Sequence, residues 1–131
     1  MLRIFQTKNP HIIRSVFNFE PDLEHEFIII NKDTKIIGMF EIQPVTKITG
    51  ILHLHIKQEY QNQGIASEAM KKLVASLKQT NYKSLVALIP ASNKNIMSIV
   101  NKTKAKCCGL LQDGIILNNV VQDLIIFQLM V

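Results

Sequence analysis

The sequence predicts a single α/β domain over residues 1–131, built on a mixed β-sheet that helices flank. Three observations predict this class. The length of 131 residues suits one hydrophobic core. Hydrophobic residues make up 47% of the chain and charged residues 19%, and no apolar run reaches about 18 residues, which excludes disorder and a membrane-spanning helix. Segments with strand-like and helix-like spacing follow one another in the order β-α-β-β-β-α-β-α-β-β.

Turn signals separate short apolar segments in the first half of the chain. Asn9-Pro10 can open a helix, because proline fits the first helical turn, and the apolar residues from Ile12 to Phe17 then share one face. The expected elements are a strand at Leu2–Gln6, this helix, a loop over Phe19–His25, and a hairpin of strands Glu26–Asn31 and Lys35–Gln43 around a turn at Lys32–Thr34.

The second half alternates strands with helices before it ends in a hairpin. Strand–helix–strand units favour parallel pairing and hairpins favour antiparallel pairing, so the sheet should be mixed. The expected elements are a strand at Gly50–Lys57, a helix at Gly64–Thr80, a strand at Ser84–Ile89, a helix at Asn93–Lys104, and strands at Gly109–Leu117 and Val121–Met130 joined by a turn at Asn118-Asn119.

Charge is unevenly distributed along the chain. The net charge is +5, yet four of the ten acids lie between Glu20 and Glu26, while the segment from Lys57 to Lys106 holds nine lysines against two acids. A basic half of this kind indicates a polyanionic partner, either nucleic acid, a membrane surface or a nucleotide cofactor, or simply a solvated lysine-rich surface. Cys107 and Cys108 are adjacent and have no zinc-site spacing to other ligands, and the N-terminus lacks a signal-like apolar stretch, so we expect a cytoplasmic protein without a metal site.

The segment from Ile56 to Ser67 is the most informative in the chain. It joins a strand to the start of a long helix, and Gly64 and Ala66 keep that junction small. The unpaired N–H groups and the positive dipole end of a helix N-terminus can bind an anion such as a pyrophosphate. An ordinary tight turn between a strand and a helix would contain the same residues.

The pattern Gln61-x-x-Gly64-x-Ala66 resembles the acetyl-CoA-binding motif of the GNAT family of N-acetyltransferases, Gln/Arg-x-x-Gly-x-Gly/Ala. Glu59-Tyr60 before it and Pro90-Ala91-Ser92-Asn93 after the next strand resemble further signatures of that family. The resemblance implies a mixed, mostly antiparallel, splayed sheet of six to seven strands, flanked by three to four helices.

The resemblance also implies a set of cofactor-binding residues. The pantetheine arm of acetyl-CoA would pair with the end of the strand, and the pyrophosphate would bind the loop amides. The implied residues are Leu54, His55, Ile56, Gln61, Asn62, Gln63, Gly64, Ile65, Ala66, Ser67 and Asn93, with Lys57 and Lys94 as further phosphate contacts.

The general base is not evident from the motif. The positions where many relatives carry Glu or His are Gly50 and Leu52 here. His53 and His55 lie beside them, but strand alternation places these two on the opposite face unless a bulge intervenes. Glu41 on the preceding strand, or a water relay, is the next candidate.

The general acid is absent from its usual place. Relatives often carry a Tyr seven residues after the motif Asn, and that position is Val100 here. We interpret Tyr60 and Tyr82 as packing residues. These departures affect the expectation of turnover more than the expectation of fold or cofactor binding.

The sequence therefore predicts an acetyl-CoA-dependent N-acetyltransferase that acts directly on an amine, carried by a small molecule or a protein. Two alternatives stay open: a non-catalytic module that binds CoA or a nucleotide with the same fold, and a basic nucleic-acid-binding domain. The nucleic-acid-binding alternative is disfavoured because the chain has no Trp and few aromatic residues or arginines to contact bases. The apolar segment Val121–Met130 could pair across a homodimer or lie within the sheet.

Overall fold

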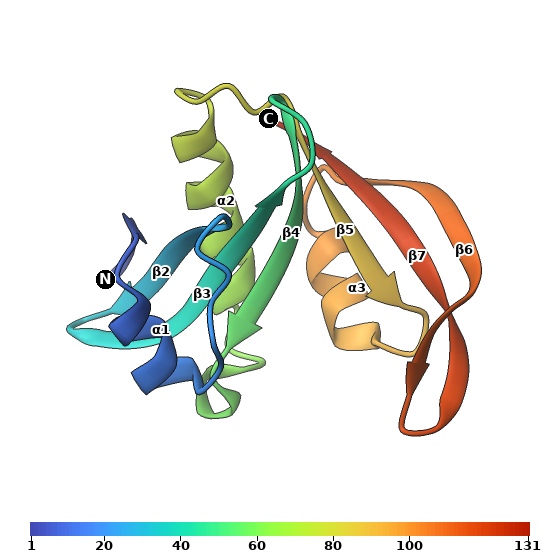
Figure 1. Ribbon diagram of the computed structural model, residues 1–131, viewed down its shortest axis with the longest axis horizontal. Coiled ribbons are helices and arrows are strands. Elements are labelled where there is room, and N and C mark those ends of the chain that lie inside the picture. Colours follow the sequence, from blue (N-terminus) through green and yellow to red (C-terminus); the bar gives the residue numbers. More distant parts are fainter.

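The computed structural model describes all 131 residues and contains seven β-strands and three α-helices (Figure 1). A single 3₁₀ turn, Gln58–Tyr60, precedes the second helix. In chain order the elements are β1 (Leu2–Thr7), α1 (Pro10–Phe17), β2 (Glu26–Lys32), β3 (Lys35–Pro44), β4 (Thr49–Ile56), α2 (Ile65–Leu77), β5 (Ser84–Pro90), α3 (Lys94–Asn101), β6 (Lys106–Leu117) and β7 (Val120–Met130).

All seven strands form one sheet in the order β1-β2-β3-β4-β5-β7-β6. Every neighbouring pair is antiparallel except β4 and β5, which are parallel. The prediction of a mixed, mostly antiparallel sheet is therefore confirmed, and so is the order of the elements.

The sheet splays at its centre, between β4 and β5. These two strands pair only through Thr49 with Ser84, Gly50 with Leu85 and Ile51 with Val86. Beyond these pairs the strands diverge, and Figure 1 shows the gap widening toward the end of β4 where α2 begins. The backbone edges of the remaining residues of β4 are consequently free of a strand partner on this side.

The helices cover the two faces of the sheet unequally. α2 and α3 lie on one face, where the largest core cluster joins Phe40, Leu73 and Leu85, and a smaller cluster joins Ile89, Val100 and Phe127 under α3. α1 lies on the other face, over Phe27, Ile29 and Met39 (Figure 1). The two faces of the opening between β4 and β5 therefore differ, one covered by α2 and α3 and the other flanked by α1.

Two helices end earlier than the sequence pattern predicts. α2 ends at Leu77 rather than at residue 80, and α3 at Asn101 rather than at residue 104. In each case a threonine donates both its hydroxyl and its backbone N–H to a carbonyl of the last turn, with hydroxyl distances of 2.6 Å from Thr80 to Leu77 and 2.6 Å from Thr103 to Val100. The earlier end of α3 lets β6 begin at Lys106, three residues before the expected position.

None of the helices combines the length and the apolar character that crossing a membrane requires.

Candidate active site

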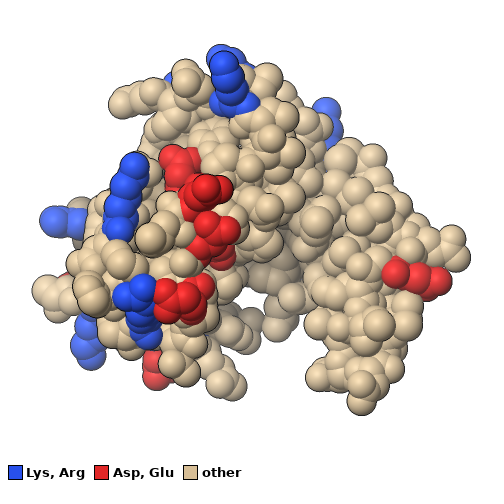
Figure 2. Space-filling view, viewed as in Figure 1, with Lys and Arg blue, Asp and Glu red and all other residues tan.

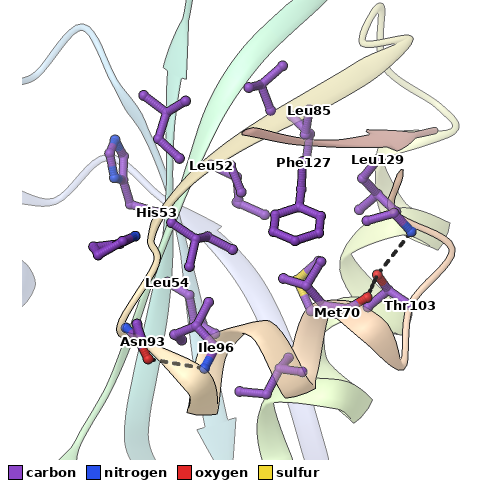
Figure 3. Close-up of a pocket in the computed structure, with 18 of the residues that line it drawn as sticks. Leu52, His53, Leu54, Met70, Leu85, Asn93, Ile96, Thr103, Phe127 and Leu129 are labelled. Atoms are coloured by element: carbon purple, nitrogen blue, oxygen red, sulfur yellow. Dashed lines mark hydrogen bonds between the residues drawn. The ribbon is translucent and has the colours of Figure 1, made fainter. Parts of the chain in front are cut away.

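The opening between β4 and β5 leads into an apolar pocket of about 220 Å³ (Figure 3). Met70 of α2, Leu85 of β5 and Phe127 of β7 lie around it, and 14 of its 19 lining residues are hydrophobic. Two of the polar exceptions already have partners: Thr103 donates to Val100, and the Oδ1 of Asn93 accepts from the N–H of Ile96 at 3.2 Å. The pocket interior therefore suits a nonpolar group.

A larger and more polar pocket of about 600 Å³ adjoins the first one near the end of β4. The two adjoin, since five residues line both of them: Leu54, His55, Asn93, Ile96 and Ile99. The loop between β4 and α2 forms one wall of the larger pocket, and α3 forms the opposite wall. Together the two pockets make a cavity that is polar at one end and apolar at the other.

The loop before α2 presents a row of free backbone donors to the larger pocket. Asn62 and Gly64 have positive φ angles of 62° and 76°, which turn the chain into α2. No N–H group from Asn62 to Ser67 donates a hydrogen bond within the protein. These six amides sit at the positive end of the α2 dipole, so the loop can bind a phosphate or pyrophosphate.

The two glutamines of the motif brace this loop. Gln61 donates from Nε2 to the carbonyl of Ile56 at 3.1 Å, and Gln63 donates from Nε2 to the carbonyl of Glu59 at 3.0 Å. Gln61 still lines the larger pocket, whereas Gln63 does not. Apart from the two suggested lysines, all the other residues that the sequence suggested for cofactor binding line that pocket: Leu54, His55, Ile56, Gln61, Asn62, Gly64, Ile65, Ala66, Ser67 and Asn93.

The lysine at this pocket is one that the sequence did not suggest. Lys57 and Lys94 are not among its lining residues, whereas Lys102, beyond the end of α3, is. Asn95 and Ser98 of α3 also line it. A phosphate held by the loop amides would thus face a cationic and hydroxyl-bearing wall, and the packing of α3 against β5 and β7 brings that wall into place.

The histidines of β4 lie on the α1 face of the sheet. The β3–β4 register runs without a shift from Gly38–Ile56 to Pro44–Gly50, so β4 contains no bulge. Leu52 and Leu54 consequently pack on the α2 side, while His53 and His55 point the opposite way, as Figure 3 shows for His53. Both imidazoles remain at the edge of the apolar pocket.

Gly50 is one of the two positions where many members of the family that this sequence resembles carry the general base. In this structure it faces the core. A Cβ at Gly50 would lie 2.6 Å from Cγ2 of Ile42 and 3.2 Å from the ring of Tyr82. No side chain fits at this position without displacing its neighbours, so a general base cannot stand here. His53 and His55 remain as the candidate bases on β4.

Glu41 connects two imidazoles on the α1 face. Its Oε2 lies 2.6 Å from Nδ1 of His25, and its Oε1 lies 3.3 Å from Nε2 of His55. His25 in turn has Asp22 at 3.4 Å, and the ring of Phe19 packs 5.4 Å from the ring of His55. The loop between α1 and β2 is thereby fastened to the central strands.

The ionisation of Glu41 decides the proton positions in this cluster. Burial opposes the charge of Glu41, but hydrogen bonds from His25 and His55 outweigh burial, so the pKa of Glu41 is lower than that of an ordinary carboxyl group. An ionised carboxylate can only accept, so Nδ1 of His25 and Nε2 of His55 carry the hydrogens that face it. Nδ1 is then the nitrogen of a neutral His55 that can accept a proton.

His53 differs from His55 in having no hydrogen-bond partner. Partial burial lowers the pKa of His53; the attraction of Glu41 opposes this shift, and repulsion from His55 and His25 adds to it. The net pKa is below the usual histidine value, so His53 is neutral at pH 7 and free to accept a proton.

No tyrosine takes the place of the missing acid. Val100 stands at the expected position and lines the apolar pocket. Tyr60 lines the phosphate end of the cavity, and Tyr82 donates to Glu26 on a different part of the sheet. Burial and this contact with Glu26 raise the pKa of Tyr82 above the ordinary phenol range, so it is a poor proton donor.

Acidic side chains gather on the α1 side of the cleft, as Figure 2 shows. The loop between α1 and β2 supplies several of them. Glu20 is paired with Arg14 at 2.6 Å and Asp22 with His25, whereas Glu24 is exposed and has no ion-pair partner. This side of the opening is thus negatively charged.

Sequence reasoning missed His25 and Lys102 as site residues. His25 stands within the acidic run, where its environment resembles a solvated loop, and its contact with Glu41 joins positions 16 residues apart. Lys102 follows the C-terminal end of α3, whereas the cofactor signature at Asn93 lies at the opposite end of that helix. Neither residue had a local signal, since both depend on how distant segments pack.

Comparison with known proteins is consistent with this geometry. Residues 2–99 match the family model described as "Acetyltransferase (GNAT) family". No protein with a curated description matches the sequence significantly.

Several solved structures share the fold over nearly the whole chain. A GNAT family acetyltransferase from Elizabethkingia anophelis with acetyl-CoA bound is 16% identical, with a TM-score of 0.76, and the match covers 99% of this chain and 98% of that one. An N-acetyltransferase from Staphylococcus aureus Mu50 is 17% identical, with a TM-score of 0.79 and coverage of 99% and 98%. Mutant forms of the spermidine/spermine N-acetyltransferase from Vibrio cholerae are 13% identical, with a TM-score of 0.86 and coverage of 99% and 95%. At these identities the likeness establishes the fold.

Proposed function

Because the chain belongs to the GNAT family of acetyltransferases, we propose that it transfers an acetyl group from acetyl-CoA directly to an amine. The observation that supports this most is the pair of adjoining pockets at the open end of β4. Free loop amides lie at its polar end, and an unpartnered imidazole, His53, stands at the edge of its apolar end. A CoA thioester has phosphates that suit the polar end and an acyl group that suits the apolar end.

The residues of the polar end fit a CoA ligand. The amides from Asn62 to Ser67 would hold its pyrophosphate, with Lys102 as a cationic neighbour. The unpaired edge of β4 beyond Ile51 would hydrogen-bond the pantetheine amides. Acetyl-CoA supplies an activated acetyl group, whose C–S bond breaks as the new N–C bond forms.

His53 is the residue that we assign as general base. A neutral imidazole at the mouth of the opening can take the proton that the amine releases on attack. Glu41 lies directly across the β3–β4 ladder from His53 and stabilises the imidazolium that results. Water supplies the proton for the leaving thiolate, because no side-chain acid lies at the position of Val100.

A cationic amine is the acceptor that the charge of this face favours. The acidic loop between α1 and β2 flanks the opening on the α1 side (Figure 2), and His53 points to this same side of the sheet. A negative rim raises the local concentration of a protonated amine before one nitrogen loses its proton to the base.

The test is calorimetric titration with acetyl-CoA, with CoA and ATP as controls. Micromolar binding that is selective for acetyl-CoA and CoA is the expected result. Release of free thiol in the presence of a panel of polyamines, lysine derivatives and neutral amines would then demonstrate transfer. Absence of binding would overturn the assignment of the cavity.

A non-catalytic CoA-binding module is the second candidate. The apolar Val100, where relatives often carry a tyrosine, is the observation that favours it. The two functions separate in one experiment: a module binds acetyl-CoA with the same affinity but releases no thiol with any amine of the panel.

A further inference from the structure

We propose that the acceptor is an amphiphilic primary amine, whose ammonium group faces the acidic side of the opening while its alkyl or aryl body lies on the apolar α1 face of β5 and β7. This rests on the function proposed above and names the class of acceptor for the same site. It goes beyond a cationic amine because it fixes the side of the opening that the rest of the molecule takes.

His53 and Leu88 lie at the same height on the two edges of the opening. Ile51 of β4 pairs with Val86 of β5 in parallel register. His53 and Leu88 each follow two residues further along, so both point to the same face of the sheet as this pair. Both also line the rim of the apolar pocket. An acceptor nitrogen within reach of His53 therefore has Leu88 on its other side.

The α1 face of β5 and β7 is apolar beyond Leu88 and no helix covers it. Leu88 pairs with Ile126 of β7, and Leu111 of β6 pairs with Leu124 two residues along the same strand, so all four share a face. Leu88 is 37% exposed and Leu111 is 46% exposed. The reason is that α3 packs on the opposite face, against Phe127, while α1 covers only β2 and β3. Adjoining exposed apolar side chains of this kind mark a binding surface.

The charges around the opening distinguish its two sides. β5 contains no charged residue, and the only one in β7, Asp123, accepts a hydrogen bond from the N–H of Asp113 at 2.9 Å. The opposite side carries the exposed Glu24 and the ionised Glu41. Figure 2 shows acidic side chains gathered on the α1 side of the cleft and none beside the cleft on the other side. A ligand with one charged end and one apolar end matches this arrangement.

The apolar side favours a hydrocarbon over a second polar group. An ammonium or hydroxyl group laid on Leu88 and Ile126 would lose water without gaining a hydrogen bond. An alkyl or aryl group in the same place removes its own surface and that of the two side chains from water. A polyamine would leave one of its charges on this face unless it folded back toward the acidic loop.

The transfer itself is the same for any primary amine. The ammonium group first releases one proton to water, and the neutral nitrogen attacks the thioester carbonyl. The N–C bond then forms as the C–S bond breaks, the next proton of the nitrogen passes to His53, and the thiolate takes a proton from water.

The test compares three acceptors of equal length with the full chain and saturating acetyl-CoA: hexylamine, 5-amino-1-pentanol and 1,5-diaminopentane. They differ only in a terminal methyl, hydroxyl or ammonium group. We expect kcat/KM, measured by thiol release, to be highest for hexylamine, by about fivefold over the amino alcohol and by more over the diamine.

Any other ranking of the three amines, equal rates included, would overturn the proposal and leave the proposed function intact. A diamine that ranks first would place the body of the acceptor on the acidic loop. No thiol release with these three amines would also overturn the proposal, and no release with any amine would overturn the proposed function as well.

A matched pair of variants locates the apolar contact. Leu88 and Leu117 are both 37% exposed, but Leu117 lines neither pocket. It lies near the tip of the β6–β7 hairpin, about 20 Å along β7 from Ile126. Leu88→Gln should lower the preference for hexylamine over the amino alcohol about fivefold, and Leu117→Gln should leave this preference unchanged. Ile126→Thr gives the same readout from the neighbouring strand if Leu88→Gln does not fold.

Two other occupants of this face would give different results. If a second copy of the chain covers it, Leu88→Gln should sediment as a smaller assembly than the wild type and lose activity equally with both amines. If the cofactor arm covers Leu88, calorimetry should show a matching loss of acetyl-CoA affinity in Leu88→Gln. Either result would overturn the proposal, which expects an unchanged mass and an unchanged acetyl-CoA affinity.

Discussion

The two histidines of β4 differ in what surrounds them, although they lie two residues apart on the same face. His55 is held by Glu41 and packed against Phe19. His53 has no hydrogen-bond partner, and its pKa is below the ordinary value. A hydrogen-bonded imidazole such as that of His55 is suited to keeping the site rigid. A neutral imidazole without a partner, such as that of His53, is suited to accepting a proton. Their roles should therefore separate on mutation.

Substitution of His53 should reduce the rate without reducing cofactor affinity. His53→Gln removes the basic nitrogen, so we expect kcat to fall by roughly 10²-fold or more. The wild type should lose activity as the pH falls through the pKa of His53, below about 6.5, because only the neutral imidazole accepts a proton. This loss of activity at low pH should be missing from the pH–rate profile of the variant. His11→Gln, an exposed histidine of α1, is the control, and an unchanged rate for His53→Gln would transfer the role to His55 or water.

His25 should act through Glu41 rather than on the substrate. The two side chains are only 17% and 14% exposed, so loss of the contact in His25→Ala should cost about 1.5–3 kcal/mol of unfolding free energy. Glu41 has a lowered pKa in the folded state, so this contribution is present above the ordinary carboxyl pKa and disappears as the pH falls through the folded value. Denaturant unfolding at several pH values measures it.

The conservative variant His25→Asn distinguishes positioning from simple stabilisation. Its amide nitrogen can reach the place of Nδ1 and donate to Glu41 without titrating. We expect His25→Ala to raise the KM for the amine severalfold, because the loop that carries Phe19 loosens, and His25→Asn to restore it. An amine KM that stays unchanged in His25→Ala would limit this contact to stability.

At the scale of elements, the turn into α2 joins the backbone to cofactor binding. Gly64 has a φ of 76°, and a Cβ there would meet no atom within 4 Å. Backbone conformation, rather than space, is therefore what favours glycine, and a left-handed L-residue costs about 1–2 kcal/mol. Asn62 shows that asparagine tolerates the same region in this loop.

Gly64→Asn and Gly64→Glu form a matched pair that tests the phosphate role of this turn. Both keep a polar side chain in open space, but only Glu adds a negative charge beside the free amides. We expect Gly64→Glu to weaken acetyl-CoA binding by at least 100-fold and Gly64→Asn by less than tenfold, as measured by calorimetry. Similar affinities in both variants would separate the motif from phosphate binding.

The elements themselves were predictable because each has a local cause. Alternation along β4 placed His53 and His55 opposite Leu52 and Leu54, and the asparagine cap at Asn93 fixed the start of α3. The ends of α2 and α3 were misjudged because a helical spacing continues past the point where a threonine hydroxyl takes the last carbonyls. Periodicity shows which face of a helix is apolar, but it does not show where the helical backbone hydrogen bonds end.

At the scale of the whole molecule, the splay of one sheet assembles a site from both halves of the chain. The loop before α2 carries its own signal in the sequence, whereas Lys102 reaches the larger pocket because α3 packs on β5 and β7. The joining of His25 to Glu41 likewise depends on how the loop after α1 folds back over β3. Sequence reasoning therefore found the part of the site made by one continuous segment and missed the parts contributed from elsewhere.

The charge on the α1 face leads to a prediction about the acceptor. The sequence alone treats Glu20, Asp22 and Glu24 alike, but the structure distinguishes them: Glu20 is neutralised by Arg14 and Asp22 lies beside His25, while Glu24 is unpaired. Glu24→Gln should therefore raise the KM for a cationic amine about two- to fivefold at low salt, since an exposed charge attracts a cation over about a Debye length of 10 Å.

Glu20→Gln should alter this KM less than Glu24→Gln does, because it removes a charge that Arg14 already balances. In 1 M salt the Debye length shortens to about 3 Å, so the difference between the two variants should vanish. Acetyl-CoA affinity should stay constant in both, since the acidic loop lines neither pocket. Steady-state kinetics with a polyamine and with a neutral amine at both salt concentrations measures the effect. An equal rise in KM for the neutral amine would show that the loop acts by shape rather than by charge.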